Sequence, residues 1–330
     1  RNWLYPRRLY LMVGKLTPDD IATASTLPAI MGMSRYKTPN DALRDAIAEI
    51  EGTREDTWTG NEATRWGDKL EGTIITEAAD RLGLKDLCLE FPKAFFHDSL
   101  PLACSLDGSA IGEGVITTSV QRGIYCMNAD RIDLAGTGII ESKLTSAAPE
   151  DIPSPFRGPW QLQAQMMCTG HKWGVVATFY RGIELRLFVY QADEGMQKRI
   201  TAAVHEFEER KRNRDWYPAV SSDDADRAYS SVDYGAPDID LSSFPHGEAA
   251  LVELLEAKDA KAAAESRIED AQIVLKEIMG SHEGARGLAG NAAYRVVWQQ
   301  ISYKAKPKKV TPAKDGYSIR AKTLKLKPID

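Results

Sequence analysis

The stretch GIIESK at residues 138–143 combines the composition of a β-strand with two charged side chains at its end. Side chains alternate along a strand, so Glu141 and Lys143 are predicted to emerge on one face, while Ile140 and Ser142 face the other. The stretch therefore brings a carboxylate and an ammonium group to one face of a sheet.

Helical and strand-like patterns surround this stretch over the first two thirds of the chain. Apolar residues recur at helical spacing in some segments, and β-branched and aromatic residues mark others. The order of helices, mixed strands, helix, hairpin and helix indicates an α/β fold, a mixed central β-sheet flanked by helices. Helices are expected over 19–33, 39–51, 62–83, 158–170 and 193–214, and strands over 87–96, 101–106, 124–127, 131–134, 138–143, 175–180 and 184–190.

The last third of the chain has a different composition. Residues 219–247 are rich in Ser, Asp and Pro with little periodicity, which predicts a linker between a core domain, 1–218, and an extension, 248–330. The extension is expected to be a C-terminal helix plus a small basic β region, with elements over 248–279, 293–303 and 317–326.

Composition excludes several classes of protein. The chain has 330 residues, 43% hydrophobic and 27% charged, which excludes collagenous, disordered and disulfide-scaffold proteins. No apolar run approaches the ~18 residues of a membrane span, so no membrane partner is expected. The four cysteines lack CxxC spacing and are expected to be reduced and mostly buried thiols in a cytoplasmic protein.

Charge is distributed unevenly around the net value of −5. Residues 281–330 contain 11 Lys and Arg against 3 Asp and Glu, so the rest of the chain is acidic. A basic tail favours an anionic partner such as a phosphate backbone, and a solvated tail is the alternative.

Asp107, Glu141 and Lys143 form the strongest candidate for chemistry. Mg²⁺ takes oxygen ligands and usually holds one or two protein carboxylates, with water and substrate phosphate in its other positions. Such an ion polarises a phosphoryl oxygen and lowers the pKa of a bound water. The lysine can orient or deprotonate that water, or balance developing charge. The plainer alternative is an exposed ion pair on a strand.

Two glutamines and a further acid extend this candidate site. Gln161 and Gln165 are four residues apart and share a face of the helix expected over 158–170. An uncharged amide can bind a water or a phosphate oxygen without altering the charge around a metal. A polar exposed helix face is the alternative, and Glu71 taken alone is a surface carboxylate.

Five motifs follow one another along the chain: ASTLPAIMGMSRYKTPNDAL at 24–43, WGDKLE at 66–71, ACSLDG at 103–108, IIESKL at 139–144 and WQLQAQMMCTG at 160–170. In this order they resemble the motifs of YqaJ-type viral recombinases, relatives of phage lambda exonuclease within the PD-(D/E)xK nuclease superfamily. The resemblance spans roughly residues 20–215 and implies a restriction-endonuclease-like core. It also implies a Mg²⁺-dependent 5′–3′ exonuclease on linear double-stranded DNA, which leaves 3′ overhangs for phage-type homologous recombination by strand annealing.

The resemblance also implies roles for individual residues. It assigns metal binding to Asp107, Glu141, the Ser142 carbonyl and Glu71, and catalysis to these acids with Lys143 and Gln161. It implies Mg²⁺, replaceable by Mn²⁺, with two ions per site. For binding DNA and phosphate, it implies Ser25, Arg35, Lys37 and Gln165. The alternative for Arg35 and Lys37 is that of solvated loop charges.

One departure from the family pattern precedes Ser25. The arginine that holds the 5′-phosphate in the family has no match here, and Pro18 lies near its register. Lys15 or Arg8 is the candidate replacement, so a requirement for a 5′-phosphate is left open.

A second departure lies between the two principal acids. Residues 109–131 look like an insertion into the usual short hairpin. Asp133, eight residues before Glu141, is consequently a rival to Asp107 as the first metal ligand. Asp107 is favoured because CSLDG fits the motif better.

Three functions follow, with exonuclease first. An endonuclease of the same superfamily and a non-catalytic DNA-end-binding module are the alternatives. By resemblance, the expected partners are double-stranded DNA ends, further copies of the chain in a trimeric ring, and a single-strand annealing protein. The expected location is the cytoplasm, that of the host cell if the chain is phage-encoded.

Overall fold

The computed structural model describes residues 17–54, 60–230 and 235–299. These residues belong to two compact units, divided after Ser230, which are described separately below. No helix among the described residues is long and apolar enough to cross a membrane. The four cysteines are free thiols, as expected, but of the four Cys104 alone is buried, so the expectation of mostly buried thiols is wrong.

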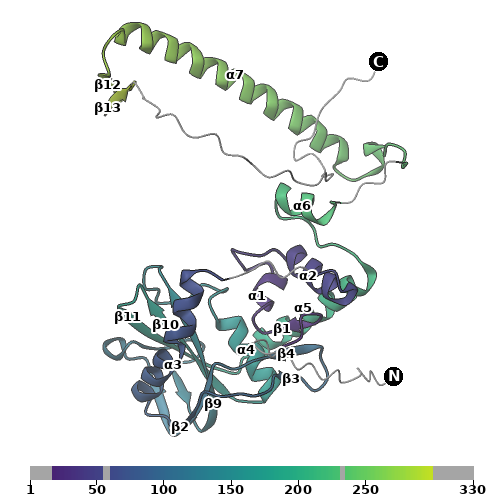
Figure 1. Ribbon diagram of the computed structural model, residues 1–330, viewed down its shortest axis with the longest axis vertical. Coiled ribbons are helices and arrows are strands. Elements are labelled where there is room, and N and C mark those ends of the chain that lie inside the picture. Colours follow the sequence, from purple (N-terminus) through teal and green to yellow (C-terminus); the bar gives the residue numbers. More distant parts are fainter. Residues whose placement is uncertain (1–16, 55–59, 231–234, 300–330) are drawn as a thin grey trace, which may run out of the picture. The chain divides into compact units, whose positions relative to one another are not determined.

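A six-stranded mixed sheet forms the centre of the first unit (Figure 1). Its strand order is β2-β5-β9-β10-β11-β7. β9 runs parallel to β10 and antiparallel to β5, and β10 and β11 form the expected hairpin. The mixed α/β fold is therefore confirmed. The strands are β2 (Lys85–Cys88), β5 (Gly108–Gly112), β7 (Ile124–Cys126), β9 (Gly136–Thr145), β10 (Trp173–Tyr180) and β11 (Glu184–Gln191).

The two faces of this sheet pack against different helices. Ile139 on β9 belongs to one apolar cluster, together with side chains of α4 (Pro159–Thr169) and α5 (Glu194–Asn213). Ile140 belongs to a second cluster with α3 (Glu62–Leu82). The alternation continues along the strand, so Glu141 and Lys143 emerge on the α4 face.

The segment expected to be an insertion adds strands to the sheet and beside it. β7 extends the sheet by pairing with β11. β6 (Val115–Thr117) pairs with β8 (Arg131–Asp133) in a separate two-stranded ribbon, and a short helix, η1 (Val120–Arg122), lies between β6 and β7.

The prediction of one helix over residues 19–33 is wrong. The segment contains the two-residue strand β1 (Ala22–Thr23) and the short helix α1 (Leu27–Ile30). β1 pairs with β4 (Leu102–Cys104), which also pairs with β3 (Phe95–Phe96). The hydroxyl of Thr26 accepts from the Thr23 amide and donates to the Thr23 carbonyl, which turns the chain before α1. The continuous strand expected over 87–96 is likewise divided between β2 and β3.

The segment expected to be a linker contains a helix, α6 (Ser222–Ala228), that packs on α2 (Pro39–Glu51). The buried carboxylate of Asp224 accepts from the Thr38 hydroxyl at 2.5 Å and the Asn40 amide at 3.0 Å. These contacts fasten the start of α2 to α6.

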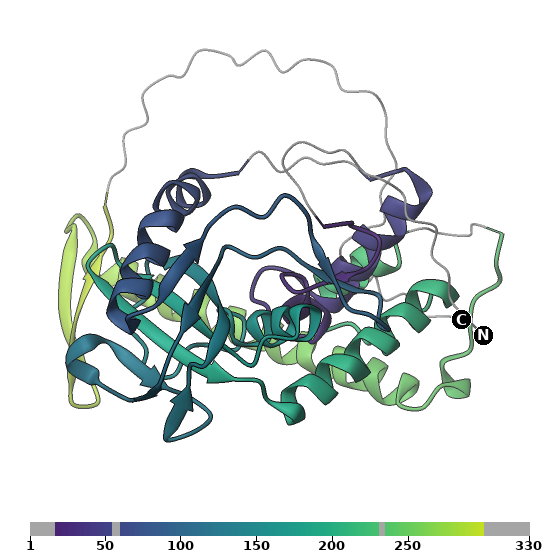
Figure 2. The ribbon, with the colours of Figure 1, turned by 90° about the horizontal axis from the view of Figure 1, so that it is seen from below.

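The second unit contains the long C-terminal helix that the sequence predicts. η2 (Leu241–Ser243) precedes α7 (Gly247–Met279), and a hairpin of β12 (Gly284–Ala289) and β13 (Ala292–Val297) follows it (Figure 2). β12 lies before the first strand that was expected here. The strand expected over 317–326 lies outside the described residues.

Candidate active site

Asp107 lies where the pairing of β5 with β9 ends. The last paired residues are Gly108 and Ile140. Two residues further along β9, the Ser142 amide points toward β5, as the backbone of Ile140 does. It donates to Asp107 Oδ2 at 2.9 Å. The N–H and C=O of one strand residue point to the same side, so the Ser142 carbonyl also faces the side of Asp107.

Glu141 is held by two side chains on its face of the sheet. It is 1% exposed. Its Oε1 accepts from Lys143 Nζ at 2.5 Å, and its Oε2 accepts from Gln165 Nε2 at 2.6 Å. Because both oxygens have charged or polar donors, the buried carboxylate is kept in one orientation.

A glycine sets the position of the helix that carries the glutamines. Gly158 precedes α4 with φ 110°, and a Cβ there would lie 2.7 Å from Val176 Cγ1. Val176 pairs with Glu141 across β9 and β10. The start of α4 is therefore pressed onto the strand beside Glu141, at a distance that only glycine permits.

Lys143 joins the strand to the first turn of α4. Its Nζ donates to Gln161 Oε1 at 3.0 Å as well as to Glu141. Burial alone would lower the pKa of this amine, but the charges of Glu141 and Asp107 outweigh it and the pKa is raised. Lys143 is consequently an ammonium group, with its side chain 27% exposed.

Glu71 reaches the same region from α3. Gly108 lies against this helix: a Cβ on it would be 2.8 Å from Ile75 Cγ2. Glu71 is one helical turn before Ile75, so this close contact brings its carboxylate to the end of β5. Burial raises the pKa of Glu71, and the neighbouring charge of Glu141 raises it further.

The site carries an excess of negative charge. Burial and the Glu141 charge raise the pKa of Asp107 to about 8, although Lys143 and the Ser142 amide oppose the shift. The charge of Glu71 adds to it. Carboxylates that raise one another's pKa in this way would be stabilised by a cation.

The donor set fits a hard divalent cation. The oxygens available are those of Asp107, Glu141 and the Ser142 carbonyl, with Glu71 beside them. Within the described part of the chain, no three His, Cys, Asp or Glu side chains are placed to hold an ion. Mg²⁺ suits such an incomplete set because it retains water and takes substrate phosphate in its remaining positions.

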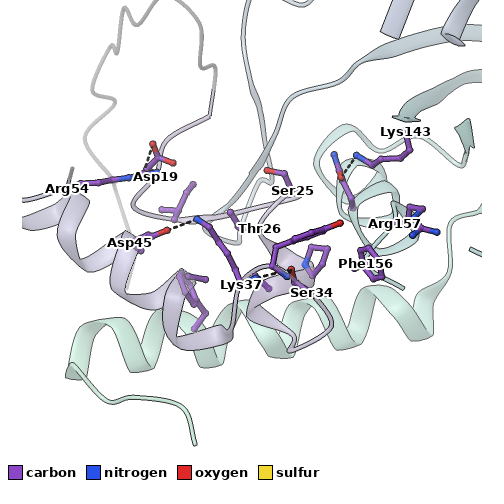
Figure 3. Close-up of a pocket in the computed structure, with 18 of the residues that line it drawn as sticks. Asp19, Ser25, Thr26, Ser34, Lys37, Asp45, Arg54, Lys143, Phe156 and Arg157 are labelled. Carbon is purple, nitrogen blue, oxygen red and sulfur yellow. Dashed lines mark hydrogen bonds and ion pairs between the residues drawn. The ribbon is translucent and has the colours of Figure 1, made fainter. Parts of the chain in front are cut away.

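A pocket of about 510 Å³ opens beside Lys143 and Gln161. Ser25 and Lys37 line it too, and Figure 3 shows both together with Lys143. With Gln161, four residues singled out from the sequence therefore line this pocket. The Lys37 ammonium lies 2.6 Å from Asp45. Further basic residues that line the pocket are Arg54 and Arg157.

The remaining sequence candidates lie as follows. Arg35 lies over the Phe156 ring, with its guanidinium carbon 5.0 Å from the ring centroid. Lys15 and Arg8 lie outside the described residues. Asp133 is exposed on β8 and accepts from the Ala135 amide, so Asp107, not its rival, lies beside Ser142.

Gln165, expected to bind DNA or phosphate, has protein partners in this structure. Gln165 is fully buried, and its amide donates to Glu141 and to the Ser105 carbonyl. Its neighbour Gln163 is also fully buried and bonds to the backbone of Gln191 and Asp193. A polar exposed face is therefore wrong for α4, because its amides satisfy buried polar groups.

Sequence reasoning missed several pocket residues. Arg54 lies 2.7 Å from Asp19, just after α2, and Arg157 lies in the proline-bearing segment before α4. Neither Arg54 nor Arg157 belongs to a motif whose spacing predicts a contact with phosphate. The exposed Tyr36 lies inside the quoted motif at 24–43, flanked by two basic residues, and that flanking was a usable signal.

This chain is similar to several solved structures. Among curated proteins none matches the chain. Solved structures with a similar chain path include the alkaline exonuclease LHK-Exo from Laribacter hongkongensis, at 17% identity and TM-score 0.42 over 59% of this chain and 89% of that one. The structure of LHK-Exo in complex with dAMP is 18% identical, with a TM-score of 0.43 and the same coverage of both chains. A phage-related exonuclease from Haemophilus somnus 129PT is 12% identical, with a TM-score of 0.38 over 59% of this chain and 94% of that one.

The family comparison covers more than half of the chain. The model of the YqaJ-like viral recombinase domain matches residues 2–172, which include the motifs around Ser25, Glu71, Asp107, Lys143 and Gln161. The chain belongs to the family of the YqaJ-like viral recombinase domain.

Proposed function

We propose that this protein is a Mg²⁺-dependent exonuclease that degrades the 5′ strand of linear double-stranded DNA and leaves a 3′ overhang. The observation that carries the proposal is that Lys143 binds both Glu141 and Gln161 beside Asp107, while Lys143 and Gln161 line a pocket together with further basic side chains. Carboxylates suit a cation, and the basic side chains suit the phosphates of its substrate.

The residues divide the chemistry among them. Asp107, Glu141 and the Ser142 carbonyl would hold Mg²⁺, which polarises a phosphoryl oxygen and makes an attacking water more acidic. Lys143 is an ammonium group, so it donates hydrogen bonds that orient the water and balance charge on the reacting phosphate. Gln161 keeps the amine of Lys143 in place.

Glu71 supports the proposal of a second ion. Its pKa is raised by burial and by the charge of Glu141, so its carboxylate would be stabilised by a nearby cation. Mn²⁺, which accepts the same oxygen ligands, should replace Mg²⁺.

The wider setting follows from the family. We propose strand-annealing recombination as the process and a single-strand annealing protein as the partner. The proposal includes a trimeric assembly around duplex DNA and a cytoplasmic location, in the host cell if the chain is phage-encoded.

One experiment tests the activity and its alternatives. Linear duplex DNA labelled at either 5′ or 3′ ends, with and without a 5′-phosphate, is incubated with Mg²⁺, Ca²⁺ or EDTA. Loss of nucleotides from 5′ ends in Mg²⁺ alone supports the proposal. Cutting of covalently closed circles supports an endonuclease. Binding of DNA ends without metal-dependent nucleotide loss supports a non-catalytic module.

A further inference from the structure

The pocket has an aromatic side that the chemistry above does not use. Among the described residues that line it, the aromatic ones are Tyr36, Phe156 and Phe207. Phe207 is 2% exposed and belongs to the core. Tyr36 is 84% exposed, so its ring is available to a ligand in the pocket.

Phe156 already has partners over its ring. The guanidinium carbons of Arg35 and Arg157 lie 5.0 Å and 5.1 Å from the ring centroid. Both are cation–π contacts, and they leave Phe156 as a support for its neighbours. Figure 3 shows Phe156 beside Arg157, on the side of the pocket where Lys143 lies.

The ring of Tyr36 makes an edge-to-face contact with the ring of Phe156. Its ring centroid lies 6.2 Å from that of Phe156, with 81° between the ring planes. The backbone amides of Tyr36 and Lys37 both donate to Ser34 Oγ, at 3.1 Å and 3.3 Å. The loop is thus held by its own hydrogen bonds, while the ring of Tyr36 projects from it.

From this arrangement we infer that Tyr36 stacks on a nucleobase. The base belongs to the terminal nucleotide of the strand being degraded, whose phosphates lie among Lys37, Lys143 and Arg157. Every base has a π-face, so stacking on an aromatic ring accepts any sequence. A volume of about 510 Å³ is suited to a small ligand unit and not to a whole duplex. This inference rests on the proposed nuclease function.

The first test measures stacking without catalysis. Duplex DNA carrying the fluorescent base 2-aminopurine at its 5′ end is titrated with the full-length protein in Ca²⁺, so that DNA is not cut. Stacking quenches the fluorescence of this base. The wild type and Tyr36→Phe should quench it, and Tyr36→Leu, which keeps an apolar side chain but removes the ring, should not. Binding with equal quenching by Tyr36→Leu would overturn the inference.

The second test is a kinetic cycle between ring and base. On an ordinary end in Mg²⁺, Tyr36→Leu should lower kcat/KM by about 10- to 100-fold, the range of one lost base–aromatic stack. On an end whose terminal nucleotide is abasic, the same substitution should have less than a twofold effect. An equal loss on both ends would mean that Tyr36 acts otherwise than by stacking.

The two proposals fail in different ways. If the wild type removes no nucleotides in Mg²⁺, the nuclease function is wrong, and 2-aminopurine quenching still decides the role of Tyr36. If the wild type digests DNA and neither readout depends on the ring, the nuclease function holds and the stacking inference is wrong. Since Tyr36 is 84% exposed, its replacement should leave the fold intact.

Discussion

The Asp107 carboxylate accepts the Ser142 amide at 2.9 Å, in the place where a further residue of β5 would pair with β9. The Asp107 side chain thus accepts a hydrogen bond from β9 where the backbone of β5 no longer pairs with that strand. The carboxylate is brought to the edge of the sheet beside Glu141, and the Ser142 carbonyl faces it. Because the Asp107 carboxylate takes the place of a backbone carbonyl, the oxygens on which the proposed chemistry depends lie together.

Asp107→Asn should abolish digestion while preserving the fold. The Asn carbonyl oxygen can still accept the Ser142 amide, but the charge that would bind Mg²⁺ is lost. We expect initial rates on linear DNA to fall by at least 10³-fold, on the order of the effect of removing a principal group in electrostatic catalysis. Asp133→Ala is the matched control and should retain at least half of the wild-type rate. An inactive Asp133→Ala beside an active Asp107→Asn would reverse the assignment.

Mg²⁺ affinity should rise with pH up to about 8, the pKa to which burial and the charge of Glu141 raise Asp107. Below that pH the carboxyl holds a proton that the ion must displace, so Kd should fall by about tenfold per pH unit between roughly pH 6 and 8 and then level off. Calorimetric titration at several pH values, with the protonation heat of the buffer varied, measures the proton released.

The stability of the metal-free protein should change in the opposite direction. A carboxyl whose folded pKa lies above its unfolded value binds more protons when folded, so its contribution to stability is complete below about pH 4 and is lost as pH rises toward 8. The thermal midpoint of the wild type without metal, measured relative to that of Asp107→Asn, should therefore drop over this range, and Mg²⁺ should restore it. In Asp107→Asn both pH dependences should be weaker. An unchanged dependence in that variant would assign the proton to another group.

Much of the site could be predicted from short patterns, because period-two alternation placed Glu141 and Lys143 on one face and four-residue spacing placed Gln161 and Gln165 on another. The orientation of Gln165 could not be predicted. Its burial depends on how closely Gly158 lets α4 approach β10, and that is a tertiary contact. The helix expected over 19–33 failed because hydroxyl contacts between Thr23 and Thr26, together with pairing to β4, outweigh helical periodicity.

Lys143 should act through its charge and its position. Lys143→Ala should lower kcat by about 10²- to 10³-fold with little change in DNA binding, since the ammonium is proposed to stabilise charge on the reacting phosphate. Gln161→Ala should have a smaller effect, about 10-fold, because Glu141 still holds the amine at 2.5 Å. Single-turnover rates and DNA titrations separate the two quantities. A loss confined to DNA affinity would mean that Lys143 only binds substrate.

Gly108→Ala should displace Glu71 by pushing α3 away from β5. The added Cβ would meet Ile75 Cγ2 at 2.8 Å, inside the van der Waals distance. Overpacking of this kind costs about 1–3 kcal/mol of the free energy of unfolding, which a denaturant midpoint measures. Ile75→Ala removes the opposing methyl group, so the double variant should lose less stability than the sum of the single losses. Additive losses would show that the contact between glycine and helix does not set the position of α3, and Glu71 would then need another explanation for its place beside Asp107.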